Sequence, residues 1–500
     1  MGLADYFRRS AIAAAQVLSG FDEVAISERL ERTSVEINLN DTESAESRSL
    51  VDLSVRLLAR FYPRLGFSGP AAAVSEQVEL ARAINPNIDI VTGKCDFGIG
   101  IGSSARPESA DSVFVGSNGW DAYLSFDGPQ EVGESRNPFG PGAAACLAVG
   151  ETFRKVFAIG EPQSTGVILS TLDLASQPSK NNFTFDGTDI GSAVLVGVGA
   201  IGNAAVWALG RAPAIGQLHL VDDQRTELSN LQRYVLSSRA DDDASKVELA
   251  MQFLQVGIRG VAHPQRWENF VAKHGYLWNQ VLVALDSAQG RRNVQASLPE
   301  WIANSWTQPG DLGISVHPWS QSGACLSCMY IPNGPVPGED RVIGSALGLT
   351  SDLELLNIRR LLHACSPLPP ELYGQVSAHL GIEPGDLAAF SDRPLRALYV
   401  EGLCGGAVLP LNRIGRPNQD VHVPIAHQSA LAGVLLGARL VARAIGQVPD
   451  TTEVTRIDVL RPLAAYLTQP MQKDARGICI CQDKVYQDTW RAKYEVTSDS

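Results

Sequence analysis

A glycine-rich turn, followed at set distances by polar side chains, is the part of this sequence best suited to chemistry. An apolar run predicts a buried strand that leads into Gly197-x-Gly199-x-x-Gly202 and then into a helix. Such a turn lets the backbone approach a phosphate closely. Asp222 ends a second predicted strand, over 217–221, where a carboxylate can meet a ribose hydroxyl. These residues predict a nucleotide site.

Three polar side chains after Asp222 indicate which kind of nucleotide binds. Asn230, Arg233 and Lys246 place an amide and two cations beside the predicted site. A nicotinamide dinucleotide has little need of them, whereas a triphosphate under attack needs cations for the charge that develops on its leaving group. The glycine turn and the start of its helix would cradle phosphate. An NAD oxidoreductase is therefore disfavoured, and nothing in the chain supplies a hydride-transfer site.

From Ser192 to Tyr330 the chain strongly resembles the E1-like, ThiF-type adenylyltransferase superfamily. This superfamily includes ubiquitin-activating enzymes and the enzymes that activate sulfur carriers for thiamine and molybdopterin synthesis. The matching residues are Gly197, Gly199, Gly202, Asp222, Glu227, Ser229, Asn230, Leu231, Arg233, Lys246 and Asp286. One departure is Gln224, which stands at the second aspartate of the family's Asp-x-Asp.

The resemblance implies ATP and Mg²⁺ as cofactors and a role for each matching residue. Asp222 would bind the ribose, Asp286 would organise magnesium, and phosphate contacts would come from Asn230, Arg233 and Lys246. An arginine from a second adenylation-like domain is also typical of the family. The candidates for it are Arg8, Arg9, Arg29 and Arg32.

The resemblance also suggests a structural zinc ion. Cys325-x-x-Cys328 has a spacing that places two thiolates on one tetrahedral zinc, and it stands in the family's position. The family usually completes the site with a second Cys-x-x-Cys near the C-terminus. This chain offers Cys479-x-Cys481, one residue shorter. The alternative is that these are ordinary thiols.

A reactive cysteine is expected in a loop that crosses over the nucleotide site. Cys404 lies in a glycine-flanked segment before Pro410, which is where the family often has its nucleophile. Its thiolate would attack the acyl-adenylate and form a thioester. Cys365, two residues after His363, is the second candidate.

The expected fold class is α/β: a Rossmann-like adenylation domain with a parallel-type sheet, preceded by a degenerate adenylation-like α/β domain, with a helical insertion. Helical and strand-like segments alternate before the glycine turn. Gly98, Gly100 and Gly102 in that region are followed by no Asn/Arg/Lys set, so a helper domain is favoured over a second active site. The predicted domains are an inactive partner over 1–185, the active domain over 186–334, a helical insertion over 335–400, and a crossover loop with the rest of the active domain over 401–500. Short helices are expected over 351–364, 370–380 and 386–399.

The amino-acid composition limits the kinds of partner and the compartment that we expect for this protein. The 500 residues are 45% hydrophobic and 19% charged, with a net charge of −13, which argues against binding to a nucleic-acid backbone. No secretory signal and no membrane-length apolar run is present. The eight cysteines then indicate thiols, ligands or nucleophiles in a cytoplasmic protein.

The function expected from these features is adenylation of the C-terminal glycine of a ubiquitin-like protein, then transfer to an enzyme cysteine and on to a conjugating enzyme. The chain could form a homodimer, and its composition is compatible with a bacterial antiviral conjugation system. The first alternative is a sulfur-carrier adenylyltransferase, in which Cys404 would carry sulfur. The second is a non-catalytic nucleotide-binding scaffold, which the intact Arg233, Lys246 and Asp286 disfavour.

Overall fold

The structure is a computed structural model, and contacts divide it into two compact units. One unit combines Met1–Ile331 with Pro424–Ser500, and the other is Pro332–Val423. The residues described are 4–15, 18, 23–40, 43–109, 111–159, 165–308, 310–319, 323–332, 338–399, 403, 425–458 and 466–495.

The first unit contains the sheet that follows the glycine turn. In the described residues it has eight strands in the order β10-β9-β8-β11-β12-β13-β14-β15. The strands from β10 to β12 are parallel, and the others join by antiparallel pairing. Their bounds are β8 Asp189–Val196, β9 Ile215–Val221, β10 Ile258–His263, β11 Gln280–Val283, β12 Trp301–Gln308, β13 Asp311–Pro318, β14 Glu453–Asp458 and β15 Tyr466–Pro470. The accompanying helices are α6 Ala200–Leu209, α7 Lys246–Met251, α8 Trp267–His274, α9 Ala288–Ala296, α10 Leu326–Met329 and α16 Lys484–Tyr494.

The N-terminal sheet repeats this topology. Its seven described strands run β3-β2-β1-β4-β5-β6-β7, again parallel from the first edge to β5 and antiparallel afterwards. They are β1 Val35–Leu39, β2 Arg64–Ser68, β3 Asp89–Val91, β4 Phe97–Ile101, β5 Asp111–Asn118, β6 Asp121–Ser125 and β7 Val167–Ser170. The helices before and around them are α1 Phe7–Ala15, α2 Glu23–Glu31, α3 Ala45–Phe61, α4 Ala71–Ile84 and α5 Phe139–Val156. The chain leaves this sheet at Ser170 and enters the next at Asp189.

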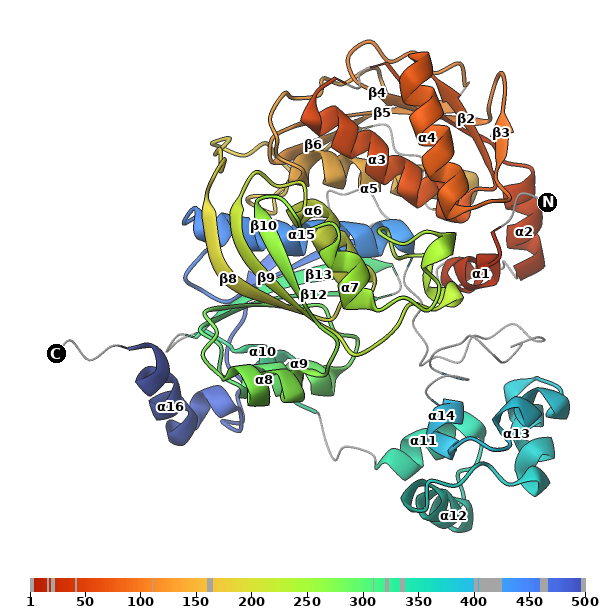
Figure 1. The fold of residues 1–500 in the computed structure, drawn as a ribbon, viewed down its shortest axis with the longest axis vertical. Coiled ribbons are helices and arrows are strands. Elements are labelled where there is room, and N and C mark those ends of the chain that lie inside the picture. The colour runs from red at the N-terminus through yellow and green to blue at the C-terminus, as the bar shows by residue number, and fades with distance from the viewer. Residues whose placement is uncertain are drawn as a thin grey trace. The chain divides into compact units, whose positions relative to one another are not determined.

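One apolar helix, α15 Ala426–Ala444, joins the two halves of this unit. It packs against α5 of the N-terminal half and against α6 and β12 of the other half (Figure 1). A Cβ on Gly433 would lie 2.2 Å from the Ile201 carbonyl oxygen, so this close approach of α15 to α6 requires glycine. The predicted fold class is confirmed: two largely parallel α/β sheets with a helical insertion. No described helix is both long and apolar enough to cross a bilayer.

The second unit is helical and has its own apolar core. Its helices include α11 Glu339–Leu347, α12 Asp352–His363, α13 Tyr373–Leu380 and α14 Leu395–Ala397. The helix predicted over 386–399 is wrong. A 3-10 helix over Pro384–Phe390 ends before Pro394, because proline lacks an amide hydrogen and excludes helical geometry from the residue before it.

The N-terminal glycines do not form a phosphate turn. Gly98 and Gly100 lie within β4, where an added Cβ would meet Ser112 Oγ and Phe114 Cδ1 at 2.6 and 2.7 Å. Close packing between strands therefore accounts for them.

Candidate nucleotide site and cysteine cluster

The glycine turn connects β8 to α6 at the carboxyl edge of the second sheet. Gly197 has a φ of 92°, which side chains rarely adopt, and a Cβ there would lie 2.7 Å from the Ala284 carbonyl oxygen. A Cβ on Gly202 would lie 2.1 Å from the Gly197 carbonyl oxygen. Gly199 precedes α6, and a Cβ there would lie 3.7 Å from the Tyr234 hydroxyl oxygen. Two of the glycines are therefore required by packing, whereas a Cβ on the third would make only an ordinary contact at the start of the helix.

This difference predicts two distinct outcomes. Gly202→Ala should destabilise the fold by roughly 2–3 kcal/mol, because its methyl group overlaps backbone. Gly199→Ala should keep the wild-type melting temperature and lose ATP binding, since its methyl group enters the space expected for phosphate. Thermal unfolding and calorimetric titration with MgATP distinguish the two. Wild-type ATP affinity in Gly199→Ala would place the phosphates elsewhere.

Asp222 lies directly after β9 and is bonded to the turn. Its Oδ2 accepts a hydrogen bond from the Val198 amide at 2.8 Å, and its Oδ1 accepts one from the Gln224 amide at 2.9 Å. The carboxylate is half-buried. The structure thus brings the predicted ribose ligand against the glycine turn.

Lys246 is the first residue of α7 and is buried beside Asp222. Its Nζ donates to Gln224 Oε1 at 2.6 Å and lies 5.3 Å from the centre of the Tyr234 ring. Burial lowers the pKa of Lys246, but Tyr234 and the Asp222 carboxylate outweigh it and raise this pKa above the ordinary lysine value. The ammonium therefore stays charged at neutral pH. Gln224, the departure from the family pattern, is its protein partner.

Tyr234 is a site residue that the sequence did not reveal. The guanidinium carbon of Arg233 lies 5.5 Å from its ring centre, so the ring contacts both predicted phosphate-binding cations. An aromatic residue after Arg233 gives no signal beyond that of an ordinary core residue.

Arg233 provides the fit test for a triphosphate. Its Nη1 atom is buried and has no hydrogen-bond partner among the described residues. A buried guanidinium nitrogen without an acceptor is costly, and a phosphate oxygen would supply that acceptor. Asn230 precedes Arg233 closely in the sequence. It is the last residue of the 3-10 helix η1 (Leu228–Asn230), and it is buried. The residues present therefore fit the predicted ATP.

Asp286 lies where β11 meets the glycine turn. The Ala284 amide donates to the Val196 carbonyl at 2.9 Å, and Asp286 is exposed two residues later. By contrast, Arg291 is buried in α9 and donates to the carbonyls of Ser305 and Leu285 and to Asn304 Oδ1. Asp286 is available to an ion, whereas Arg291 ties α9 to its neighbouring strands.

The four candidate arginines differ in their surroundings. Arg29 Nε donates to the Val156 carbonyl at 2.8 Å, and Arg32 forms an exposed pair with Glu28 at 3.8 Å. Arg8 and Arg9 lie in α1, but their side chains are outside the described part of the chain. Ala4 and Tyr6, just before α1, pack against Leu231 of the predicted site segment. Of the four candidates, Arg8 and Arg9 therefore stand on the helix that follows this contact.

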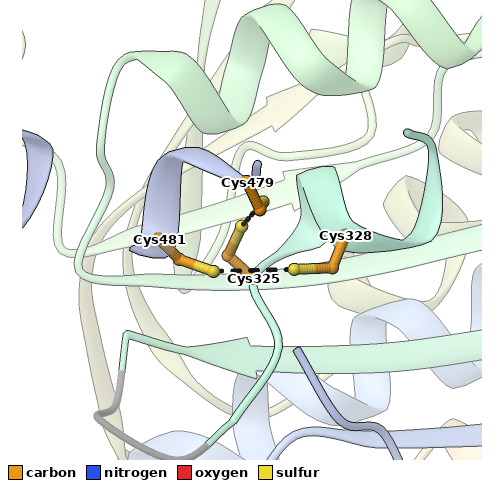
Figure 2. A group of neighbouring side chains, drawn as sticks. All are labelled: Cys325, Cys328, Cys479 and Cys481. Atoms are coloured by element: carbon orange, nitrogen blue, oxygen red, sulfur yellow. Dashed lines mark hydrogen bonds between the residues drawn. The ribbon is translucent and has the colours of Figure 1, made fainter. Parts of the chain in front are cut away.

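The predicted zinc ligands converge in space. The Sγ atoms of Cys325, Cys328, Cys479 and Cys481 all lie within 4.8 Å of one another. Two pairs are closer, Cys325 with Cys479 at 3.4 Å and Cys328 with Cys481 at 3.5 Å. Figure 2 shows the four sulfur atoms pointing toward one another from two segments far apart in sequence.

This geometry and chemistry fit a metal. Sulfur atoms at the corners of a zinc tetrahedron are about 3.8 Å apart, given Zn–S bonds of about 2.3 Å. Thiolate sulfur atoms are ligands that zinc prefers, and the four sulfur atoms lie close enough together to share one ion. Four cysteines would leave no open coordination position, which is typical of a structural site.

The remaining cysteines have different environments. Cys404 lies outside the described residues, so its predicted role stays a prediction. Cys365 is exposed after α12 in the helical unit. Cys95 and Cys146 are buried in the N-terminal half, and burial raises the pKa of both thiols, which disfavours their thiolates.

Comparison with protein families matches two segments. Residues 190–366 match the ThiF family, and residues 38–158 match a family described as Prokaryotic E2 family C. The second segment contains the buried Cys95 and Cys146 as its cysteines, so it offers no accessible thiol.

Comparison with individual proteins gives relatives in sequence and solved structures that align with this chain. The chain is 39% identical over 512 residues to the uncharacterized protein y4jF of Sinorhizobium fredii (strain NBRC 101917 / NGR234), covering 99% of this chain and 98% of that protein. It is 28% identical over 181 residues to the sulfur carrier protein ThiS adenylyltransferase of Escherichia coli K12, covering 34% and 71%. A crystal structure of E. coli MccB with succinimide aligns at 14% identity and a TM-score of 0.35, over 58% of this chain and 66%, just under two thirds, of that chain. The glycine turn, its order of polar residues, the match to the ThiF family and the identity to the ThiS adenylyltransferase together show that the chain belongs to the E1-like, ThiF-type adenylyltransferase superfamily.

Proposed function

We propose that this protein uses ATP to adenylate the C-terminal glycine of a ubiquitin-like protein. The observation that carries the proposal is the pairing of two cations, Lys246 and the partly unpartnered Arg233, across Tyr234 beside the glycine turn. This is the arrangement that a triphosphate requires when its charge moves toward a leaving group.

The first step forms an acyl-adenylate. A carboxylate oxygen of the terminal glycine attacks the α-phosphorus of ATP, and the bond to the β-phosphate breaks to release pyrophosphate. Asp222 would hold the ribose, and Arg233 with Lys246 would stabilise the growing charge on pyrophosphate. Magnesium near Asp286 would neutralise phosphate charge. Arg8 or Arg9, on the helix that follows Tyr6, would supply a further cation.

The N-terminal half would serve as a catalytically silent partner domain. Its β1-to-α3 connection is topologically equivalent to the glycine turn, yet it reads Asn40-Asp-Thr-Glu-Ser44, with no glycine and two acidic residues. The buried Glu46 carboxylate in the first turn of α3 accepts hydrogen bonds from Ser117 Oγ at 2.6 Å and the Gly119 amide at 3.0 Å. A protein carboxylate at this edge would repel phosphate. The match of residues 38–158 to an E2 family supports a conjugation system over an isolated metabolic enzyme.

The second step would transfer the acyl group to Cys404. The thiolate attacks the acyl carbon, AMP leaves, and a thioester remains for a conjugating enzyme to accept. Cys404→Ala should retain modifier-dependent exchange of pyrophosphate into ATP and lose the reductant-sensitive adduct on a non-reducing gel. The modifiers to test are small proteins with a C-terminal glycine encoded beside this gene. An adduct that persists in Cys404→Ala and disappears in Cys365→Ala would move the assignment to Cys365.

A sulfur-carrier adenylyltransferase is the second candidate function. Its support is the 28% identity to the ThiS adenylyltransferase of E. coli over 181 residues. In that case a separate persulfide donor would transfer its outer sulfur atom to the Cys404 thiolate and be left as a thiol. With that donor present Cys404 would carry a persulfide, and no thioester adduct would form in the wild type. Mass spectrometry of Cys404 after reaction distinguishes the two.

A further inference from the structure

Two arginines of the N-terminal half reach the segment that follows Arg233. Arg60 of α3 donates through Nη2 to the carbonyl of Tyr234 at 2.6 Å and to that of Ser237 at 2.5 Å. Arg56, one helical turn earlier, donates through Nη1 to the Val235 carbonyl at 2.8 Å. Three of the four backbone carbonyls of residues 234–237 therefore accept hydrogen bonds from arginines of α3, which lies in the N-terminal half.

The same segment is also held from the side of the glycine turn. The Leu236 amide donates to Asn203 Oδ1 at 3.1 Å, and Asn203 Nδ2 donates to the Val198 carbonyl at 3.1 Å. Residues 234–237 belong to no helix or strand. Backbone turns pair the Tyr234 amide with the Asn230 carbonyl at 3.2 Å and the Ser237 amide with the Tyr234 carbonyl at 3.1 Å. The side chains of Arg56, Arg60 and Asn203 supply further partners that a helix or strand would otherwise provide.

Within its own helix Arg60 donates through Nη1 to the Arg56 carbonyl, and its hydrogen bonds outside that helix go to the carbonyls of Tyr234 and Ser237. Arg60 is 1% exposed, and no carboxylate of the described residues forms an ion pair with it. Burial lowers the pKa of Arg60 to about 10, which still leaves it charged at neutral pH. Burying an unpaired charge is unfavourable, so its bonds to carbonyls must compensate.

Arg56 is fixed by a network that crosses between the two halves. Asp52 Oδ2 accepts from Arg56 Nε at 2.9 Å, from Trp207 Nε1 at 2.7 Å and from Arg211 Nη2 at 2.9 Å. Arg56, Trp207 and Arg211 lower the pKa of Asp52 overall, although burial opposes them. The carboxylate thus stays ionised and anchors α3 to α6.

We propose that Arg60, supported by Arg56, is a positioning residue through which the N-terminal half orders the nucleotide site. It holds the backbone of Tyr234, and Tyr234 in turn contacts both Arg233 and Lys246. The inference rests on the proposed function for its effect on ATP, and it gives the silent half a specific task at the active site.

Binding of MgATP to the full chain, measured by calorimetry, tests the proposal. Arg60→Met should weaken MgATP binding by roughly 10- to 100-fold, because small displacements of binding groups have effects of this size. Arg60→Lys should recover part of the affinity. The matched control is Arg154→Met, since Arg154 is also a buried arginine of the N-terminal half but bonds to Glu151 and Ile159 there. It should lower thermal stability without changing the affinity of the folded protein.

A double-mutant cycle separates positioning from general damage. If Arg60 acts through the segment that carries Arg233, Arg60→Met should weaken binding less in an Arg233→Ala background than in the wild type. Fully additive effects, equal losses in Arg60→Met and Arg154→Met, or wild-type affinity in Arg60→Met would each overturn the proposal.

Hydrogen exchange without nucleotide provides a readout independent of the reaction. Amides over 230–238 should exchange faster in Arg60→Met than in Arg154→Met. If the wild type bound no MgATP, the proposed function would fail, and this comparison alone would decide whether Arg60 holds the segment. Unchanged exchange there would overturn the inference.

Discussion

Lys246→Ala is expected to lower modifier-dependent exchange of pyrophosphate into ATP by roughly 10²–10³-fold, the usual cost of removing one preorganised charge donor at a reaction centre. Lys246 is buried against Tyr234 and Asp222, so no solvent-exposed lysine can take its place. The fold should survive, because the Lys246 ammonium contacts only side chains of the site itself, Gln224 and Tyr234, in the described residues.

Two further variants and the pH dependence of exchange test this expectation. Lys273→Ala, an exposed lysine of α8, is the matched control and should exchange at the wild-type rate. Asp286→Ala should show a similar loss of exchange that excess Mg²⁺ partly restores, if Asp286 organises the ion.

The pKa of Lys246 is raised, so this side chain is fully charged at every pH below the ordinary lysine pKa and loses its charge only above that pKa. Exchange should therefore show no loss from this group between pH 6 and about 9. Wild-type exchange in Lys246→Ala would refute the site.

The second large effect is expected at the cysteine cluster. Metal analysis should find one zinc ion per chain, and Cys325→Ser should release it. Loss of a structural metal costs about 4 kcal/mol or more, which corresponds to a melting temperature lower by roughly 8 °C. The two ligand pairs come from residues 325–328 and 479–481, so the ion would fasten the C-terminal segment to the sheet.

Helix α16 offers a local test of this role. Trp490 Nε1 donates to the Pro299 carbonyl at 3.2 Å, and its ring stacks on the ring of Trp319 with the ring centres 6.0 Å apart. Amides of α16 should exchange faster in Cys325→Ser, while those of α3 should not change. Cys365→Ser, at an exposed cysteine of the helical unit, should keep the metal. A stable wild type without metal would show that the four thiols do not form a zinc site.

The local patterns of the sequence determined the fold class and the two strands that precede the glycine turn and Asp222. The buried strand predicted before Gly197 is β8, and the strand predicted over 217–221 is β9. Burial in strand β1 could not be predicted in this way, because its alternating pattern is typical of a half-exposed strand whereas all five residues are buried. Glu36 is tolerated there because Ser68 Oγ and the Glu108 amide donate to its carboxylate, and these partners come from distant parts of the chain.

The sequence by itself also determined the order of the glycine turn, Asp222, Arg233 and Lys246, because these residues follow one another at short distances along consecutive elements. Only the tertiary structure decided what lies between and behind them. Tyr234 became a candidate site residue because its ring lies against two cations. Arg60, 174 positions earlier in the sequence, donates to the Tyr234 carbonyl from α3 of the N-terminal half. The cysteines show the same division. Spacing predicts a metal pair at Cys325 and Cys328, but whether a shorter Cys-x-Cys can complete it depends on where the C-terminal chain folds back, since long-range packing sets the distances between sulfur atoms.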